Sequence, residues 1–566
     1  MGENTVRKKQ GFLQGAFILV IATGLVKILG AFFRIPLNNI IGELGMGYYS
    51  TAYDLYLPIY SLAMAGLPIA ISRIVAECIA SKRYNDARKT MKVARRAFLV
   101  TGLTGFVLLL AISYPFTLFI KNSGVLLSLW SIAPSLLFCC VMSSYRGYYE
   151  GIRNMYPTAV SSVIEALGKL ILGISSAFLV IKLYGEVAAE SASVASAATL
   201  MSISIGTGLG ALYLAIKYKR QGDGITVEEL ASSPPAKSSK ETLKGLVVIA
   251  IPIVLGSLAT QISNIIDVTM VQLQISRIVE NSPEVIKSMY SDLIASKEWA
   301  DSDIANGLYG CYKGNAYSIY NLVPSLMSVL GVSALPVLAT AWVEKNSKSV
   351  KQNMEIMIKT AALFAMPAGI GMAVLAEPIM LLLYPKSPEG VAVAAPMLTV
   401  LGIAAIFSGI SAPLINMLQA IGKQNIPVRN IAVGAVLKVI INLILVGIPQ
   451  INIHGAVIGT LVCYVYIATA NFICLIKYSK VMPNIYKCLV KPLISAAVCG
   501  VSAYLAYSIL EKIGIDLKLV TVISILIGVI FYAIVLILLR TIDTEDIKTL
   551  PKGEKIAKVL EKLKLI

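Results

Sequence analysis

The stretch AFLVTGLTGFVLLLAISYPFTLFI, residues 97–120, decides the fold class of this 566-residue chain. It carries no charged side chain, and a helix of about 20 apolar residues is long enough to cross the hydrocarbon core of a bilayer. An open strand would leave backbone N–H and C=O groups unsatisfied in lipid. The stretch therefore predicts a transmembrane helix.

The whole chain has the composition of a membrane protein. Hydrophobic residues make up 57% and charged residues only 14%, whereas soluble domains have about 25% charged residues. This excludes a water-soluble globule, and the hydrophobicity is too high for a disordered chain. We predict an all-α polytopic membrane protein.

Thirteen other apolar runs resemble residues 97–120, so we predict fourteen transmembrane helices. An even number of crossings places both termini on the same side of the membrane. The predicted runs are 11–33, 48–71, 97–120, 124–145, 156–181, 191–216, 245–275, 311–342, 360–383, 391–419, 426–447, 453–476, 489–510 and 519–540.

The positive charges orient these helices. Of the 49 Lys and Arg residues, the segments on the side of the N-terminus hold about 36, the opposite loops hold about nine, and about four lie inside the runs. This bias predicts that both termini face the cytoplasm of a bacterial cell membrane. Because the net charge of +18 is gathered in alternate loops, it does not indicate a nucleic-acid partner.

The runs suggest two related halves. The second and eighth runs share an Ala-Tyr-x-x-Tyr pattern at 52–56 and 316–320. In the fifth and eleventh runs, Lys169 follows Pro157 as Lys438 follows Pro427. We predict two pseudo-symmetric six-helix lobes plus two C-terminal helices. The expected parts are an N-lobe at 1–216, a cytoplasmic linker at 217–244, a C-lobe at 245–480, helices 13 and 14 at 481–540 and a cytoplasmic tail at 541–566.

The sequence also predicts the structure of two segments outside the apolar runs. The linker at 217–244 mixes Ser, Pro and charged residues without periodicity, which is typical of an irregular connection. An insertion at 276–310 is longer than the other outer loops, and Ser282-Pro283-Glu284 resembles a helix start. We expect the insertion to form an amphipathic surface helix.

Charged side chains inside a membrane are costly and call for a role or a partner. Lys169 and Lys438 lie near the middle of their helices, one in each lobe, and with Lys27 and Arg34 they predict a cationic cavity between the lobes. Asp267 is a candidate for ion or proton coupling. The alternative for Asp267 is a structural partner such as Lys438.

Other charges have structural explanations. Glu165 lies one turn before Lys169, so the two form either an ion pair within the helix or part of the cavity. Arg73 and Glu77 have the same spacing at the inner interface, where we expect a solvated salt bridge. Lys313 lies near the end of its helix and is expected to snorkel to the interface without a functional role.

Enzyme signatures are missing from the sequence. It contains no GxxxxGK[ST], HExxH or GxSxG motif, its eight Cys show no CxxC spacing, and it has a single His. The GxGxG at 206–210 lies in a membrane run, where small residues allow close helix packing. We therefore expect no enzyme, no bound cofactor and no metal site apart from ion coupling.

Four stretches resemble a known family. They are KILGAFFRIPL (27–37), GYYSTAYDLYLPIYSLAMAGLPIAISRIVAE (47–77), RGYYEGIRNMYP (146–157) and LYGCYKGNAYSIYNLVPSL (308–326). They resemble the stage V sporulation protein B branch of the polysaccharide-export flippases. That branch belongs to the multidrug/oligosaccharidyl-lipid/polysaccharide exporter superfamily, which also contains the lipid II flippases.

The resemblance implies a mechanism and a cargo. Two lobes would alternate between inward-open and outward-open states and flip an undecaprenyl-pyrophosphate-linked glycan or peptidoglycan precursor from the inner to the outer leaflet. Helices 13 and 14 would shape a groove for the lipid tail. The partners would be this lipid-linked glycan and membrane lipid, and we expect a monomer.

The resemblance also implies roles for individual residues. Lys27 and Arg34 match positions of functional arginines. Lys27 differs from the family, because it offers the point charge of an ammonium where the family has the planar guanidinium of arginine. Asp267 resembles an acid proposed to bind sodium. Its expected partners in the eleventh helix are Lys438 and Asn442, and a resident ammonium there would compete with a metal ion.

Two other functions remain open. A cation-coupled multidrug antiporter of the same superfamily would favour acidic cavity residues, whereas basic ones outnumber them here. A membrane glycosyltransferase or polymerase would need acids such as Asp292, Glu298, Asp301 and Asp303 of the outer insertion.

Overall fold

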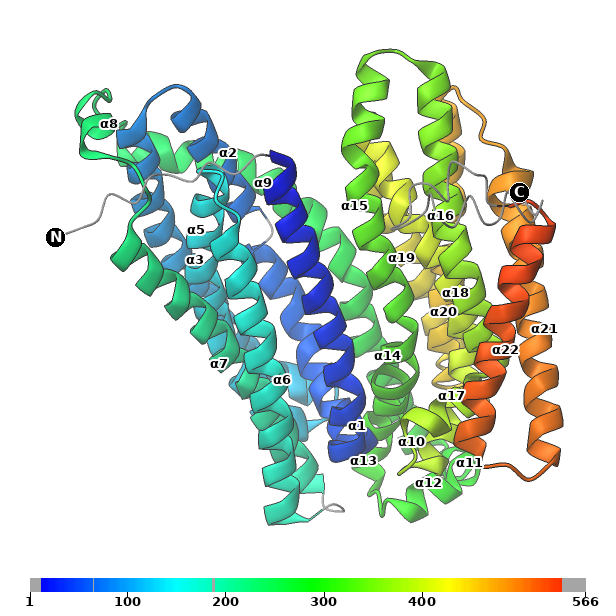
Figure 1. Cartoon of the computed structure of the whole chain (residues 1–566). Helices are drawn as coiled ribbons and strands as arrows, with labels where there is room; N and C mark the ends of the chain where they lie inside the picture. The colour runs from blue at the N-terminus through cyan, green and yellow to red at the C-terminus, as the bar shows by residue number, and fades with distance from the viewer. Residues whose placement is uncertain (1–11, 65, 186–188, 542–566) are drawn as a thin grey trace. The chain divides into compact units, whose positions relative to one another are not determined.

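The computed structural model describes residues 12–64, 66–185 and 189–541, and these residues form helices joined by short connections (Figure 1). Eleven helical segments of this described part are long and apolar enough to cross a membrane. One of them, Ile21–Ala80, contains residues 21–33 of the first predicted run and the whole of the second. The predicted runs at 245–275 and 311–342 are not among the eleven, so the all-α membrane class is confirmed and the number fourteen stays a prediction.

The helices form two compact units. The first comprises residues up to Gly314 together with Val446–Ile453. Its elements are α1 (Phe12–Met64), α2 (Leu67–Ala80), α3 (Tyr84–Phe119), η1 (Ser123–Val125), α4 (Leu126–Ile132), α5 (Pro134–Gly151), α6 (Tyr156–Tyr184), α7 (Ala189–Gln221), α8 (Val227–Ala231), α9 (Ser239–Ile266), η2 (Asp267–Val271), α10 (Gln272–Asn281), α11 (Pro283–Met289), α12 (Ser291–Ser296) and α13 (Asp301–Gly310).

The π-helical turn η3 (Cys311–Ala316) leads into the second unit, in which α21 and α22 lie side by side (Figure 1). Its elements are α14 (Tyr317–Tyr320), α15 (Leu322–Val343), α16 (Ser347–Val374), α17 (Ala376–Leu383), α18 (Pro388–Ala420), α19 (Asn425–Leu445), α20 (His454–Ser479), η4 (Tyr486–Val490), α21 (Lys491–Lys512) and α22 (Leu517–Leu538).

The boundary between the units differs from the predicted lobe boundary at residue 245. Helix α9, which was assigned to the C-lobe, packs against α1, α2 and α3 and belongs to the first unit. The pseudo-symmetry of the lobes and the lipid-tail groove at 481–540 stay predictions. The predicted tail lies outside the described residues, except for Thr541.

Helix α1 joins two of the predicted runs across a kink at Gly42. The backbone of Gly42 has φ 66° and ψ −176°, a conformation that side chains with a Cβ rarely adopt. The N-terminal part of α1 carries Lys27 and Arg34, and the part after the kink carries Tyr53 and Asp54.

Small residues bring α6 and α7 into close contact, as the GxGxG at 206–210 predicts. A Cβ on Gly206 would lie 2.9 Å from the backbone oxygen of Glu165, and one on Gly168 would lie 2.9 Å from the Cα of Gly206. The GxGxG therefore holds the helix of Glu165 and Lys169 against α7.

The expected irregular linker is folded onto the first unit. It contains the short helix α8, which starts with a capping box of Thr226 and Glu229. Asp223 accepts two hydrogen bonds from Arg88 at 2.8 and 2.9 Å and one from the Tyr148 hydroxyl at 2.8 Å. Burial acts to raise the pKa of the Asp223 carboxyl, but these hydrogen bonds outweigh it and lower the pKa.

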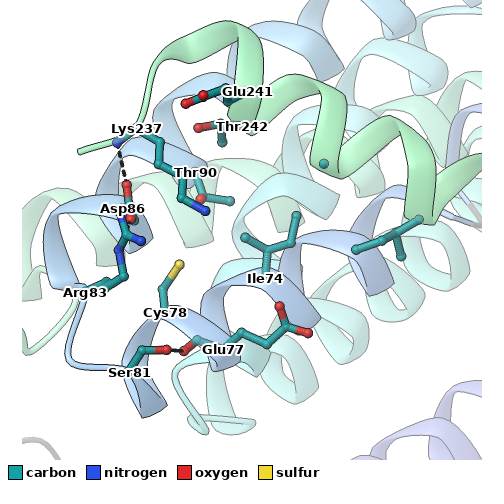
Figure 2. Close-up of a pocket in the computed structure, with 12 residues that line it drawn as sticks. Ile74, Glu77, Cys78, Ser81, Arg83, Asp86, Thr90, Lys237, Glu241 and Thr242 are labelled. Atoms are coloured by element: carbon teal, nitrogen blue, oxygen red, sulfur yellow. Dashed lines mark hydrogen bonds and ion pairs between the residues drawn. The ribbon is translucent and has the colours of Figure 1, made fainter.

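The second half of the linker is held by the start of α3. The Asn85 amide donates to the backbone oxygens of Leu230, Ser233 and Pro234. Asp86 accepts from the backbone N–H of Lys237 at 2.6 Å, as Figure 2 shows. The composition did not reveal these contacts because each one pairs the linker with a residue more than 100 positions away.

The insertion at 276–310 is not the single surface helix that we expected. It forms the end of α10 and the helices α11, α12 and α13, although α11 does begin after Ser282 as predicted. Asn306 is buried and donates to the backbone oxygen of Leu44, and a Cβ on Gly310 would lie 1.8 Å from the oxygen of Glu43. The tight contact of α13 with α1 makes the insertion part of the core of the first unit.

Candidate functional site

Two predicted cationic residues meet at one aromatic ring in the first unit. The guanidinium carbon of Arg34 on α1 lies 5.8 Å from the centre of the Tyr53 ring. The Lys169 ammonium on α6 lies 5.3 Å from the same centre and 4.9 Å from the centre of the Phe33 ring. We call Phe33, Arg34, Tyr53 and Lys169 the cation–aromatic cluster.

The packing of α1 on α6 builds this cluster. Phe33 is buried against Gly173, because a Cβ there would lie 2.7 Å from the Phe33 ring. The Lys169 ammonium thus has aromatic faces beside it. A cation over an aromatic face gains about 0.5–2 kcal/mol, but the ring does not neutralise its charge.

Glu165 is engaged elsewhere. Its carboxylate forms an ion pair with Arg146 of α5 at 3.0 Å and accepts from the Thr207 hydroxyl at 3.3 Å. The ion pair within the helix between Glu165 and Lys169, which the sequence left open, is therefore not formed. Within the described part of the chain, neither Arg34 nor Lys169 takes part in an ion pair.

Lys27 lies on α1 seven residues before Arg34 and thus on the same helix face, about 10 Å away along the axis. Its side chain is half-buried and has a polar or aromatic partner within the protein. Lys27 can extend the positive charge of the cluster along α1.

Lys438 and Asn442 lie one turn apart on α19 in the second unit, and both are buried. They pack against Gly459 of α20, where a Cβ would lie 2.2 Å from the Asn442 amide oxygen. Both polar atoms of the Asn442 amide are buried without a hydrogen-bond partner. The role of Lys438 in a cavity shared with Lys169 stays a prediction.

The predicted snorkelling of Lys313 was wrong. The residue is only 2% exposed, and its ammonium lies 2.9 Å from the Asp267 carboxylate and 3.3 Å from that of Asp54. Tyr309 donates to Asp54 at 2.8 Å, and Tyr312 donates to Asp267 at 3.4 Å. We call these five residues the buried ion cluster.

Two π-helical turns bring the buried ion cluster together. Asp267 begins η2 and Lys313 lies in η3, whereas Asp54 comes from α1. A π turn inserts an extra residue into a helix and redirects side chains, and such turns are frequent at functional sites. The sequence pattern predicted regular helices at both positions.

The Asp267 carboxylate does not fit a sodium site in this structure. Sodium needs several oxygen ligands, whereas the Lys313 ammonium lies within hydrogen-bond distance of this carboxylate. No group of three or more His, Cys, Asp and Glu residues in the described part of the chain could hold a metal ion.

A pocket lies where α2, α3 and the linker meet, and Figure 2 shows its lining. Its volume is about 330 Å³, and it is lined by both cations and acids, including Arg83, Asp86, Lys237 and Glu241. Asp86 is ion-paired with Arg83 at 2.6 Å. The mixed charge makes this pocket a poor candidate for an anionic cargo.

A family model described as polysaccharide biosynthesis protein matches residues 12–342, which is more than half of the chain. The chain belongs to this family. A second model, MatE, matches residues 313–444.

Curated relatives of this family member come from Bacillus subtilis (strain 168). The chain is 25% identical to the lipid II flippase MurJ over 504 residues, which cover 87% of each chain. It is also 25% identical to stage V sporulation protein B over 559 residues, covering 96% of this chain and 98% of the relative.

Solved structures show that the family member shares a fold with transporters. A lipid II flippase MurJ in an inward closed conformation matches with a TM-score of 0.64 and 17% identity, covering 92% of this chain and 98% of that one. An inward-facing multidrug resistance MATE family transporter matches with a TM-score of 0.58 and 16% identity, covering 81% and 99%. Together with the apolar helices, these findings identify a multi-pass membrane protein.

In this family member, sequence reasoning missed Asp54 of the buried ion cluster and Arg146, the ion-pair partner of Glu165. Asp54 stands inside the predicted run 48–71 and could have been found, because an acid in a membrane span needs a partner. Arg146 follows the end of the run 124–145 and gave no such signal. In contrast, the Arg73–Glu77 pair is confirmed as an exposed salt bridge at 3.0 Å.

Proposed function

We propose that this chain is a flippase that moves a polyprenyl-pyrophosphate-linked glycan, either a polysaccharide unit or a peptidoglycan precursor, from the inner to the outer leaflet by alternating access. The observation that carries the proposal is the cation–aromatic cluster, in which Arg34 and Lys169 approach one ring without an ion-paired carboxylate. The name of one curated relative, the lipid II flippase MurJ, supports the same class of cargo.

The chemistry of the cargo explains why such a cluster is needed. A pyrophosphate is rejected by hydrocarbon, whereas its polyprenyl tail is already soluble there. The protein therefore has to shelter only the headgroup. Arg34 can bind phosphate oxygens through its planar fork, and Lys169 can add a charge whose attraction is strong at reduced dielectric.

The alternatives have less support. In the outer insertion, Asp303 accepts from Tyr48 at 3.3 Å and Asp301 is ion-paired with Lys287 at 2.8 Å, which are structural roles for two acids that a transferase would use. In the first unit, Lys313 is ion-paired with Asp54 and with Asp267, the acid considered for ion coupling in a drug antiporter. Coupling to a proton or another ion remains part of the proposal, and export at clamped ion gradients would measure it.

The proposal is tested by native mass spectrometry of the purified protein and by export assays. We expect co-purified polyprenyl-pyrophosphate-linked glycans in the wild type, and loss of export at normal membrane levels in Lys169→Ala and Lys438→Ala. Unchanged export by both variants would contradict the cationic-cavity model. Drug resistance on overexpression that Asp267→Asn abolishes would favour the antiporter.

The proposed location is a bacterial cell membrane with both termini in the cytoplasm. A single cysteine placed in the linker of a cysteine-free variant tests this orientation. We expect an impermeant thiol reagent to label it only after the cells are opened.

A further inference from the structure

We propose that a row of tyrosines on α1, next to the cation–aromatic cluster, is the surface on which the sugars of the cargo stack. We call Tyr49, Tyr53, Tyr56 and Tyr60 the tyrosine row. This inference rests on the proposed function, because it assigns the glycan part of the same headgroup to a place beside its pyrophosphate.

The tyrosine row is continuous. Neighbouring ring centres lie 5.8 Å apart for Tyr49 and Tyr53, 6.0 Å for Tyr53 and Tyr56, and 5.4 Å for Tyr56 and Tyr60. The spacing of three or four residues places all four rings on one face of the helix. At 1.5 Å per residue the row extends about 16 Å along the axis, a length that suits a short oligosaccharide.

The two ends of the row carry different charges. Arg34 and Lys169 lie beside Tyr53, in the N-terminal half of the row. At the other end, Tyr60 lies within electrostatic range of the Arg146–Glu165 ion pair. A headgroup whose pyrophosphate binds the two cations would therefore place its sugars over Tyr53 to Tyr60, and Arg146 and Glu165 could hydrogen-bond to the hydroxyls of a distal sugar.

Exposure separates the four rings into two kinds. Tyr49 and Tyr56 are buried, and the Tyr56 hydroxyl accepts a hydrogen bond from Ser135 at 2.9 Å. Tyr53 and Tyr60 are only half-buried, so part of each residue remains accessible. The Tyr49 hydroxyl is buried without a hydrogen-bond partner, which leaves a donor beside the cluster for a polar ligand.

Aromatic faces and sugars have complementary surfaces. The face of a tyrosine ring is negative, and the C–H groups on one side of a pyranose carry partial positive charge, so the two stack. The hydroxyls at the edge of the sugar remain free for polar partners. A row that served only for packing would have no reason to leave Tyr53 and Tyr60 accessible next to unpaired cations.

The test measures binding of two probes to the full-length purified protein in nanodiscs. One probe is undecaprenyl pyrophosphate, and the other is the same lipid bearing a hexosamine disaccharide. We expect Tyr60→Leu to weaken binding of the disaccharide lipid by about 3- to 10-fold and to leave the bare pyrophosphate lipid unchanged. Tyr60→Phe, which keeps the ring, should bind both probes as the wild type does.

Controls keep the result interpretable. Tyr114→Leu removes an exposed tyrosine on α3 and should change neither probe. Tyr60→Met is measured alongside, so that the result does not depend on the folding of one variant. Equal weakening of both probes by Tyr60→Leu and Tyr60→Met, or no change for the disaccharide lipid, would overturn the tyrosine row as a sugar surface. If the wild type bound neither probe, the proposed function itself would fail.

Discussion

Lys169 and Lys313 are lysines of the same unit that experience opposite surroundings. Lys313 lies within 3.3 Å of two carboxylates, and two tyrosine hydroxyls donate to the same acids. Lys169 faces the rings of Phe33 and Tyr53, and its helix neighbour Glu165 is paired with Arg146. The first lysine is ion-paired with two acids, whereas the second has aromatic rings beside it and takes part in no ion pair within the described part of the chain.

The comparison teaches that a buried charge is not by itself a functional signal. In a buried ion pair, the attraction between the two charges offsets the cost of removing each from water, so little attraction remains for a ligand. A cation beside aromatic rings is only weakly stabilised and gains more from an anion that arrives. We therefore propose a structural role for the buried ion cluster and a binding role for the cation–aromatic cluster.

The largest expected effect on stability is at the buried ion cluster. Lys313→Met leaves two buried carboxylates without their cation and should lower the free energy of unfolding by about 3–5 kcal/mol. The triple variant Asp54→Asn, Asp267→Asn and Lys313→Met removes all three charges and should regain much of this loss. Thermal unfolding in detergent measures both, and a stable Lys313→Met would show that the ion cluster does not support the fold.

The opposite result is expected at Lys169. Lys169→Gln should change the free energy of unfolding by no more than about 1–2 kcal/mol, since only a cation–π contact is lost. It should weaken binding of undecaprenyl pyrophosphate by about 10- to 150-fold, because a hydrogen bond to a charged group is worth about 1.5–3 kcal/mol. Titration of the lipid in nanodiscs tests this, and full affinity with lost stability would reverse our assignment of the two lysines.

Asp223 lies in the linker, outside the membrane runs, and is ion-paired with one cation, Arg88. Asp223→Asn breaks the ion pair with Arg88 and should free the linker, at a cost of about 1–3 kcal/mol. Limited proteolysis should then cleave at 223–238 faster than in the wild type. Glu228→Gln, an exposed residue of the same linker, is the matched control and should not change the rate.

The pH dependence of the linker follows from the lowered pKa of Asp223. A carboxyl with a depressed pKa adds stability above the pKa of the unfolded state, about 3.9, and loses it as the pH falls through the folded pKa. Proteolysis of the wild-type linker should therefore be constant from pH 8 to 5 and rise only below about pH 4. An increase near neutral pH would contradict the role of Asp223.

The smallest effect is expected at an exposed ion pair. Arg73 and Glu77 are 66% and 61% exposed, and such pairs contribute about 0–1 kcal/mol. Arg73→Gln should unfold at nearly the same temperature as the wild type and bind both lipid probes normally. A large loss of binding would mean that positive charge at the end of α2 also recruits the headgroup.

Particular residues show how far sequence reasoning reached. Arg34 and Lys169 were predicted because membrane cations stand out against apolar runs, and they do converge on Tyr53. The pairing of Asp267 was open, since its partner Lys313 lies 46 positions away and on a separate π turn. The docked linker was missed for the same reason, because Asn85 and Asp223 are paired with distant segments.

The amino-acid sequence by itself determined that this protein lies in a lipid bilayer and not in water. Long runs without charge cannot remain in water, and only helices satisfy their backbone in lipid, so the all-helical membrane class follows from composition. Only the tertiary structure decided which buried charges are neutralised. That outcome depends on which helix faces pack together, because a carboxylate from a distant segment reaches Lys313 and none in the described part of the chain is ion-paired with Lys169.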